Sequence, residues 1–192
     1  MKKLIIILVI IAACSSVSAQ SNSGIIKQIG NCNDIEILQS GIMNYCSAFQ
    51  QGNENYFLSE QNGIGNHINY SDFNSSEENQ LNKSVIIQKG IFNYSDIQNE
   101  GMINNYNFQQ RGLMNIQNIV NSGNENDFII NQFGYNNNVN QLIESNSAFY
   151  EVNQIGNCNS LYHIDNTNDG IGLIVNQTGE SINTIIINGC IR

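Results

Sequence analysis

Residues 28–33 read Gln-Ile-Gly-Asn-Cys-Asn, and the same frame returns eleven residues later, at 39–44, as Gln-Ser-Gly-Ile-Met-Asn. Further copies at 50–55 and 61–66 keep the spacing of eleven. An amide occupies the first position, glycine the third and asparagine the sixth. A fixed period that fills a chain is the signature of an architecture in which each unit packs on the next.

The repeat continues through the sequence as fifteen units, with two irregular steps. Sixteen residues separate Asp72 from Gln88, and twelve separate Asp165 from Gln177. The first of these steps predicts a five-residue insertion within 73–83, in a surface loop after a degenerate unit. From Gln88 onward, units that begin with glutamine alternate with a second type, so that the full period is about twenty-two residues in two similar halves.

Three columns of the repeat carry most of the signal. The first predicts an internal amide ladder at Gln28, Gln39, Gln50, Gln61, Gln88, Asn99, Gln110, Asn121, Gln132, Gln154 and Gln177. The third predicts turn glycines at Gly30, Gly41, Gly52, Gly63, Gly90, Gly101, Gly112, Gly123, Gly134, Gly156 and Gly179. The sixth predicts turn asparagines at Asn33, Asn44, Asn55, Asn66, Asn93, Asn104, Asn115, Asn126, Asn137 and Asn159. Glycine gives positive φ without steric cost and asparagine tolerates the left-handed conformation, so a tight turn should follow each short strand.

The residues that precede each amide show which face of the strand is buried. Strand side chains alternate between faces. Of the thirty residues two and four positions before the amide column, 22 are apolar, against 14 of 30 on the opposite face. The amide face is therefore predicted to be the inner one. A buried amide needs a partner, and stacking in register lets each amide donate to one neighbour and accept from the other.

These patterns predict an all-β fold: a β-solenoid of about seven strand-turn-strand coils, ~22 residues each, with two facing sheets over residues 24–192. The chain contains no proline, and this absence favours continuous β-ladders because proline lacks the backbone donor. It contains 36 Asn and 16 Gln, a composition typical of cross-β assemblies. No capping element is evident at either end of the repeat. The open sheet edges could therefore template more chain.

The first nineteen residues, 1–19, are interpreted as a signal peptide. Lys2 and Lys3 precede an apolar stretch at 4–13 that is too short to span a bilayer, and Val17-Ser18-Ala19 reads as a cleavage site. A short mature segment, 20–23, would then precede the repeats. In the alternative interpretation, 11–14 is a lipobox and Cys14 becomes a lipidated N-terminus. Both predict export.

The charge of the chain excludes two classes of partner. The whole chain has 7 Lys and Arg against 16 Asp and Glu, and without Lys2 and Lys3 the balance is 5 against 16, or −11. Nucleic acids and anionic lipid headgroups both require a basic footprint. We therefore expect neither to be a partner.

The motif Gln-x-Gly-x-x-Asn resembles the repeat of curlins, the subunits of bacterial curli amyloid fibres. The full motif occurs in eight units, which begin at Gln28, Gln39, Gln50, Gln61, Gln88, Gln110, Gln132 and Gln154. The resemblance covers roughly 24–192. The resemblance implies a secreted protein that forms extracellular amyloid on the surface of a bacterium with an outer membrane. It also implies export through a curli-type pore with accessory proteins and polymerisation with itself or other curlin-like subunits. The implied role is in biofilm matrix and adhesion. The segment at 20–24 is much shorter than the secretion segment of the major curlin, and whether this chain is the bulk subunit or the nucleator stays open.

No catalytic or metal-binding constellation emerges from the sequence. His67 and His163 are interpreted as structural, because no nucleophile and carboxylate are spaced to complete a triad. We therefore expect no enzyme, no cofactor and no metal site.

The four cysteines that remain after removal of the leader are not spaced for pairing within one chain. Cys32 and Cys158 occupy identical hexapeptides nearly six coils apart, beyond disulfide reach. Cys46 should lie on the inner face, and Cys190 is near the end of the sequence. Free thiols or links between subunits are favoured.

Two functions follow. The first is a secreted structural protein that assembles into, or nucleates, curli-like amyloid fibres. The alternative is a monomeric β-solenoid adhesin displayed on the cell surface and lipid-anchored at Cys14.

Overall fold

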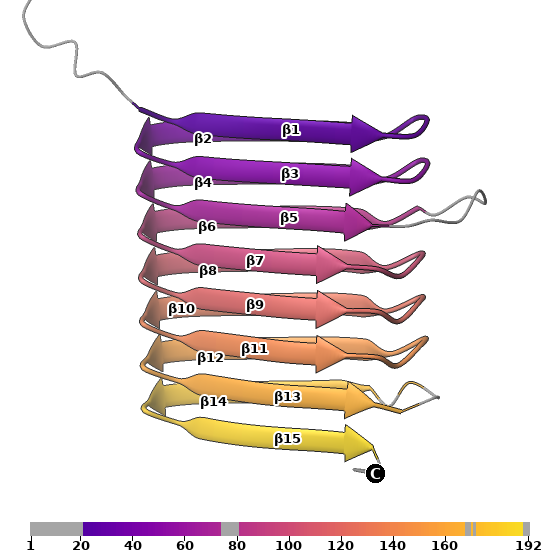
Figure 1. Cartoon of the computed structure of the whole chain (residues 1–192). Helices are drawn as coiled ribbons and strands as arrows, with labels where there is room; N and C mark the ends of the chain where they lie inside the picture. Colours follow the sequence, from indigo (N-terminus) through magenta and orange to yellow (C-terminus); the bar gives the residue numbers. More distant parts are fainter. Residues whose placement is uncertain (1–20, 74–80, 168–169, 171, 190–192) are drawn as a thin grey trace, which may run out of the picture.

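The computed structural model describes residues 21–73, 81–167, 170 and 172–189, and every regular element in these ranges is a β-strand (Figure 1). The strands are β1 (Ser23–Ile29), β2 (Asp34–Ile42), β3 (Tyr45–Gln51), β4 (Tyr56–Ile64), β5 (His67–Phe73), β6 (Lys83–Ile91), β7 (Tyr94–Asn99), β8 (Asn105–Leu113), β9 (Ile116–Asn121), β10 (Asp127–Tyr135), β11 (Asn138–Ile143), β12 (Phe149–Asn157), β13 (Ser160–Asn166), β14 (Leu173–Glu180) and β15 (Asn183–Gly189). The predicted signal peptide, Cys14 and Cys190 lie outside the described residues. None of the described segments forms a helix long and apolar enough to cross a membrane.

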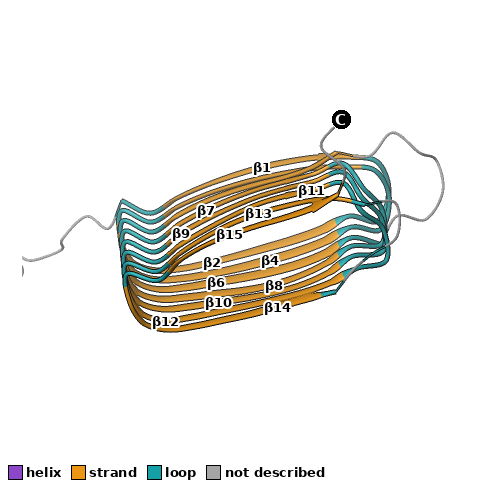
Figure 2. Cartoon of the chain, turned by 90° about the horizontal axis from the view of Figure 1, so that it is seen from below, coloured by secondary structure: helices purple, strands orange, loops and turns teal. Residues whose placement is uncertain are grey.

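The strands form two parallel sheets that face one another. The odd-numbered strands make an eight-stranded sheet in the order β1-β3-β5-β7-β9-β11-β13-β15, which we call the odd sheet. The even-numbered strands make the seven-stranded even sheet, from β2 to β14. Viewed along the stacking axis, the chain traces a flattened spiral with turns at its two corners (Figure 2). The predicted β-solenoid of about seven coils is confirmed.

The repeat columns stack in register. Gln88 pairs with Gln110 on β8, and Gly90 with Gly112, a step of twenty-two residues. Between β4 and β6 the step is twenty-seven, because Tyr56 pairs with Lys83. The insertion after β5 is thus accommodated without moving any column. Phe73 ends β5 and Lys83 begins β6, and residues 74–80 between them lie outside the described residues, so the surface loop within 73–83 stays a prediction.

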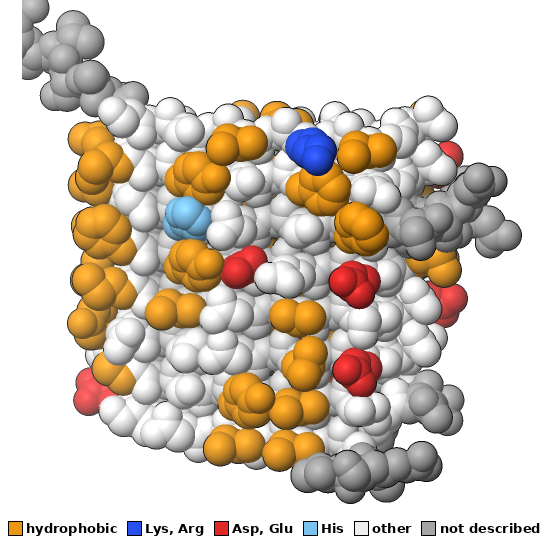
Figure 3. Space-filling view, viewed as in Figure 1, with side chains coloured by type: hydrophobic (Ala, Val, Ile, Leu, Met, Phe, Trp, Pro, Cys, Tyr) orange, Lys and Arg blue, Asp and Glu red, His pale blue; other side chains and the backbone are white. Residues whose placement is uncertain are grey.

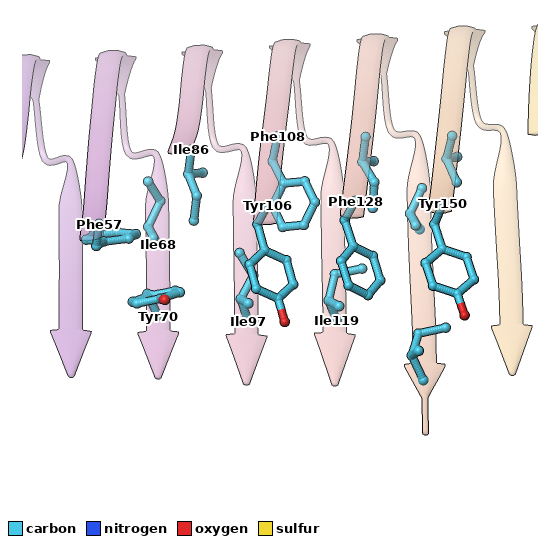
Figure 4. Close-up of a cluster of buried hydrophobic side chains, with 14 of the residues drawn as sticks. Phe57, Ile68, Tyr70, Ile86, Ile97, Tyr106, Phe108, Ile119, Phe128 and Tyr150 are labelled. Carbon is cyan, nitrogen blue, oxygen red and sulfur yellow. The ribbon is translucent and has the colours of Figure 1, made fainter. Parts of the chain in front are cut away.

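The inner faces of both sheets form one apolar core. Phe57 of the even sheet stacks on Tyr70 of the odd sheet with ring centroids 4.3 Å apart, and Tyr106, Phe128 and Tyr150 form a column along the axis with spacings of 4.9 and 5.0 Å (Figure 4). Isoleucines from both sheets belong to the same core and pack beside these rings. Side chains of the amide column lie on this same buried face, so the predicted inner face is correct.

Candidate functional site

The even sheet carries a continuous glutamine ladder. Each Nε2 donates to the Oε1 of the glutamine in the next coil, at distances from 2.7 to 2.9 Å. Each Nε2 also donates to a backbone carbonyl, as Gln110 does to Tyr94 at 2.9 Å. The ladder runs through Gln39, Gln61, Gln88, Gln110, Gln132, Gln154 and Gln177. All the donors point toward the C-terminal coil, so the ladder is polar in the sense that its hydrogen bonds run in one direction along the axis.

The ladder predicted in the odd sheet is broken, which corrects the expectation for Gln28, Gln50, Asn99 and Asn121. Gln28 donates to Gln50 at 3.3 Å, but the buried Nε2 of Gln50 has no hydrogen-bond partner among the described residues. Beyond it, Asn121 donates to Asn99 and Asn99 donates to Asp72, at 2.9 and 3.0 Å. This second run points the opposite way from the glutamine ladder.

The reversal occurs at Asp72, because an ionised carboxylate in the column can only accept. Its oxygens take hydrogen bonds from Asn82 at 3.0 Å and from the Tyr70 hydroxyl at 3.2 Å, in addition to the one from Asn99. Burial raises the pKa of Asp72 to about 7, an effect that these hydrogen bonds oppose. The odd sheet therefore carries a titratable group in the middle of its polar column.

The sixth-column asparagines do not adopt the left-handed conformation, contrary to prediction. Positive φ falls on most of the third-column glycines and on the fifth column, as at Met43 (56°), Phe92 (54°) and Met114 (57°). The asparagine side chains are instead needed as ladder groups. Asn115, for example, donates its Nδ2 to Asn93 at 3.0 Å and to the carbonyl of Gly134 at 3.1 Å.

Each corner of the coil has its own asparagine ladder. At the even-to-odd corner, side chain bonds to side chain through Asn44, Asn66, Asn93, Asn115, Asn137 and Asn159, at 3.0 to 3.1 Å. At the odd-to-even corner, each Oδ1 accepts the backbone N–H of the next coil, from Asn33 through Asn55, Asn82, Asn104 and Asn126. Asparagine thus satisfies turn backbone groups that would otherwise be buried without partners.

Two ladder residues escaped the sequence analysis. Asn22 accepts from Asn44 at 3.2 Å, one coil before the first recognised asparagine of that corner. Asn82 takes the sixth-column place in the unit that begins at Asp72, and its Nδ2 donates to Gly101 at 2.8 Å. Adding the five inserted residues to the normal spacing would have identified Asn82.

The turn glycines are required by close contact between coils as well as by φ. A Cβ on Gly112 (φ +122°) would overlap the carbonyl oxygen of Gly134 in the next coil. Gly101 and Gly123 depart from the prediction because they lack positive φ, yet their Cβ positions also overlap a carbonyl of the next coil. The glycine column is therefore set mainly by the stacking distance.

The described cysteines are free. Cys32 lies between β1 and β2 and Cys158 between β12 and β13, so their identical hexapeptides occupy opposite corners of the coil and not the same corner. Cys46 is buried as predicted. It contacts Ser59 Oγ at 3.4 Å, and burial raises the pKa of its thiol to about 11. No group of three or more His, Cys, Asp or Glu side chains in the described ranges is arranged to hold a metal ion.

His163 lies on the inner face, as the repeat predicted, where burial lowers its pKa. Its Nδ1 lies 3.1 Å from Gln141 Nε2, and its ring is packed against that of Tyr150. His67 is stacked between Tyr45 and Tyr94 on the outer face of the odd sheet. In the part of the chain that the structure describes, neither histidine is hydrogen-bonded to a hydroxyl or thiol nucleophile.

Both ends of the solenoid present strand edges. Within the described residues, no strand lies outside β1 and β2 at one end or outside β14 and β15 at the other. All seven residues of β1 are exposed, and Ile185 on β15 is 73% exposed. Such edges present backbone donors and acceptors that can pair with another strand.

The two corners differ in surface chemistry. A column of hydrophobic side chains follows the even-to-odd corner, along one edge of the face in Figure 3. Its exposed members are Ile42, Met43, Ile64, Ile91, Phe92, Met114 and Tyr135. We call this set the apolar stripe.

Comparisons of the chain with protein-family models, with curated proteins and with solved structures gave no match.

Proposed function

We propose that this protein is a secreted structural subunit that assembles into, or nucleates, curli-like amyloid fibres outside the cell. The observation that carries the proposal is the polar glutamine ladder, which runs the length of the even sheet and ends at open strand edges. A second copy can continue its backbone and amide hydrogen bonds at once. The resemblance of the repeat to curlins supports the same conclusion.

The buried face has the chemistry of a stacking unit. Its polar groups, such as Gln132 and Asn137, are bonded to their equivalents in adjacent coils. Groups used in this way position backbone and hold the register. The proposed partners are further copies of this chain and other curlin-like subunits, with export through a curli-type pore.

Fibre formation by the chain from Gln20 onward tests the proposal. Protein diluted from denaturant should form fibres after a lag, bind amyloid dyes and give a ~4.7 Å meridional reflection. Preformed fibres should shorten the lag. Monomers that persist at high concentration, with or without seeds, would contradict the proposal.

Seeding distinguishes a bulk subunit from a nucleator. Trace amounts of a nucleator shorten the lag of a second curlin-like subunit, whereas a bulk subunit builds most of the fibre mass itself. Both results agree with an assembly function, and the ratio of the two proteins in washed fibres separates them.

The apolar stripe favours a second candidate, a monomeric adhesin held at the cell surface through Cys14. Contiguous exposed apolar side chains mark interaction sites. Incorporation of a labelled acyl chain at Cys14, together with absence of fibre growth, would support the adhesin. Fibres formed by protein that lacks the acyl chain would refute it.

A further inference from the structure

The two sheets of the described solenoid differ by one strand, eight against seven. Each strand therefore lies half a coil beyond the strand before it, and β14 and β15 end at different levels. This half-coil offset restricts how a second copy can add to the C-terminal end.

We propose that copies stack head to tail with their sheets exchanged, so that β1 of the incoming copy pairs with β14 and its β2 pairs with β15. The odd sheet of one copy then continues the even sheet of the next, and successive copies are turned by about half a revolution around the fibre axis. This inference rests on the proposed assembly function.

Geometry disfavours stacking in which each sheet continues itself. If β1 pairs with β15, then β2 arrives two strand spacings beyond β14, roughly 9.6 Å away, and leaves the edge of β14 without a neighbour. If β2 pairs with β14 instead, β1 falls on the level that β15 already occupies. Sheet exchange places a strand at one spacing from both edges.

The residues of β1 match β14 more closely than they match the later strands of their own sheet. Gln28 on β1 and Gly30 (φ +114°) directly after it correspond to Gln177 and Gly179 (φ +136°) on β14. In the odd sheet, the amide column continues instead as Asn99, Asn121, Ile143, Asp165 and Asn188. Aligning Gln28 with Gln177 also stacks Ile26 on Val175, apolar on apolar.

The end of the glutamine ladder fits this docking. Gln177 donates its Nε2 to Thr184 Oγ1 at 2.9 Å, whereas interior glutamines donate to the glutamine of the next coil. Gln28 already uses its Nε2 toward Gln50, which leaves its Oε1 as the acceptor that can receive Gln177. The polarity of the even-sheet ladder is thereby extended across the junction.

Gly179 points to the same junction. Interior glycines of this column lie against the carbonyl of the next coil, but the nearest atom to a Cβ on Gly179 is Ile182 Cδ1 at 3.7 Å. Sheet exchange places Gly30 of the incoming copy on Gly179 in the register in which Gly156 already pairs with Gly179.

Disulfide trapping in fibres tests the exchange. Lys27→Cys with Asn176→Cys places the two thiols on adjacent strands only if β1 docks on β14, and Lys27→Cys with Ile187→Cys does so only if β1 docks on β15. All three positions are exposed, and neighbouring strands lie ~4.8 Å apart, within disulfide reach. Both pairs are built with Cys32, Cys158 and Cys190 replaced by serine.

Oxidised fibres of the first pair should give a series of covalent oligomers on a non-reducing gel. The amount of covalent oligomer should be at least tenfold lower for fibres of the second pair and for dilute monomer of either pair. A mixture of single variants Lys27→Cys and Asn176→Cys should give only dimers. Fibres that link through the second pair, or through neither, would overturn the exchange and leave the assembly function standing. Absence of fibres in the unsubstituted protein would refute both.

Discussion

Gly112 lies so close to Gly134 of the next coil that a Cβ on Gly112 would overlap the Gly134 carbonyl oxygen. The same contact recurs along the glycine column of the even sheet. It requires glycine for a reason that a single coil could not reveal, since the second backbone comes from a residue twenty-two positions away.

Replacing Gly112 by alanine should destabilise the monomer by about 3–5 kcal/mol, because the overlap forces two coils apart. Gly179→Ala is the matched control. Its φ is also positive, but its Cβ meets nothing closer than 3.7 Å, so only conformational strain of about 1–3 kcal/mol is expected. Urea unfolding of dilute monomers measures both. Equal losses would mean that strain alone dictates the glycine.

Replacing Gln110 by alanine should slow fibre growth more than Asn107→Ala. Gln110 is buried and joins Gln88 to Gln132 at 2.8 Å on each side, so its loss removes partners for buried groups, at about 1–3 kcal/mol each. Asn107 is exposed on the same strand. Growth rates from equal masses of seed compare the two variants, and similar slowing would contradict the assignment of the inner face.

Gln154→Ala should likewise slow growth, but Asn153 is a less neutral control than Asn107. Asn153 belongs to an outer amide ladder, accepting from Asn131 and donating to Asn176, both at 2.9 Å. We expect Asn153→Ala to fall between Gln154→Ala and Asn107→Ala in the same growth measurement. A rate equal to that of the unsubstituted protein would show that the outer ladder contributes nothing to growth.

Asp72 should make the monomer less stable as pH rises. Burial raises its folded pKa from 3.8 to about 7, so the folded state binds the proton more tightly than the unfolded chain does. This contribution is fully present below about pH 4, declines as pH rises to about 7 and is lost above that, a change on the order of 4 kcal/mol.

Asp72→Asn should remove most of this slope and increase the free energy of unfolding at pH 8 relative to the unsubstituted protein. Urea unfolding at pH 4, 6 and 8 is the measurement. Parallel pH profiles for the two proteins would show that Asp72 does not titrate in this range.

Replacing Met114 by glycine should increase the stability of the monomer. Met114 is exposed and holds φ at 57°, a conformation that costs non-glycine residues about 1–2 kcal/mol. Glycine relieves this strain but loses more conformational entropy on folding. The net effect of Met114→Gly should be a stabilisation of the monomer by about 0.5–1 kcal/mol. Leu113→Gly, one residue earlier at the end of β8, should destabilise it. Thermal unfolding of the two variants should show midpoint shifts of opposite sign.

The sequence by itself determined the period, the strand-turn unit, the buried face and the solenoid. These features depend on neighbours along the chain and on the alternation of side chains, both of which the columns record. The glutamine ladder of the even sheet was predictable for the same reason, since seven units carry the same residue in the same place.

Only the tertiary structure decided which columns form continuous hydrogen-bonded ladders and in which direction those hydrogen bonds run. The reversal at Asp72 depends on two hydrogen-bond partners, Asn82 in the turn after its own strand and Asn99 in the next coil, whose direction no single repeat specifies. The left-handed residues, the role of the asparagines and the contact beneath each glycine follow from the distance between stacked backbones. The period reveals that coils stack, but the hydrogen bonds across a strand spacing determine what each position must do.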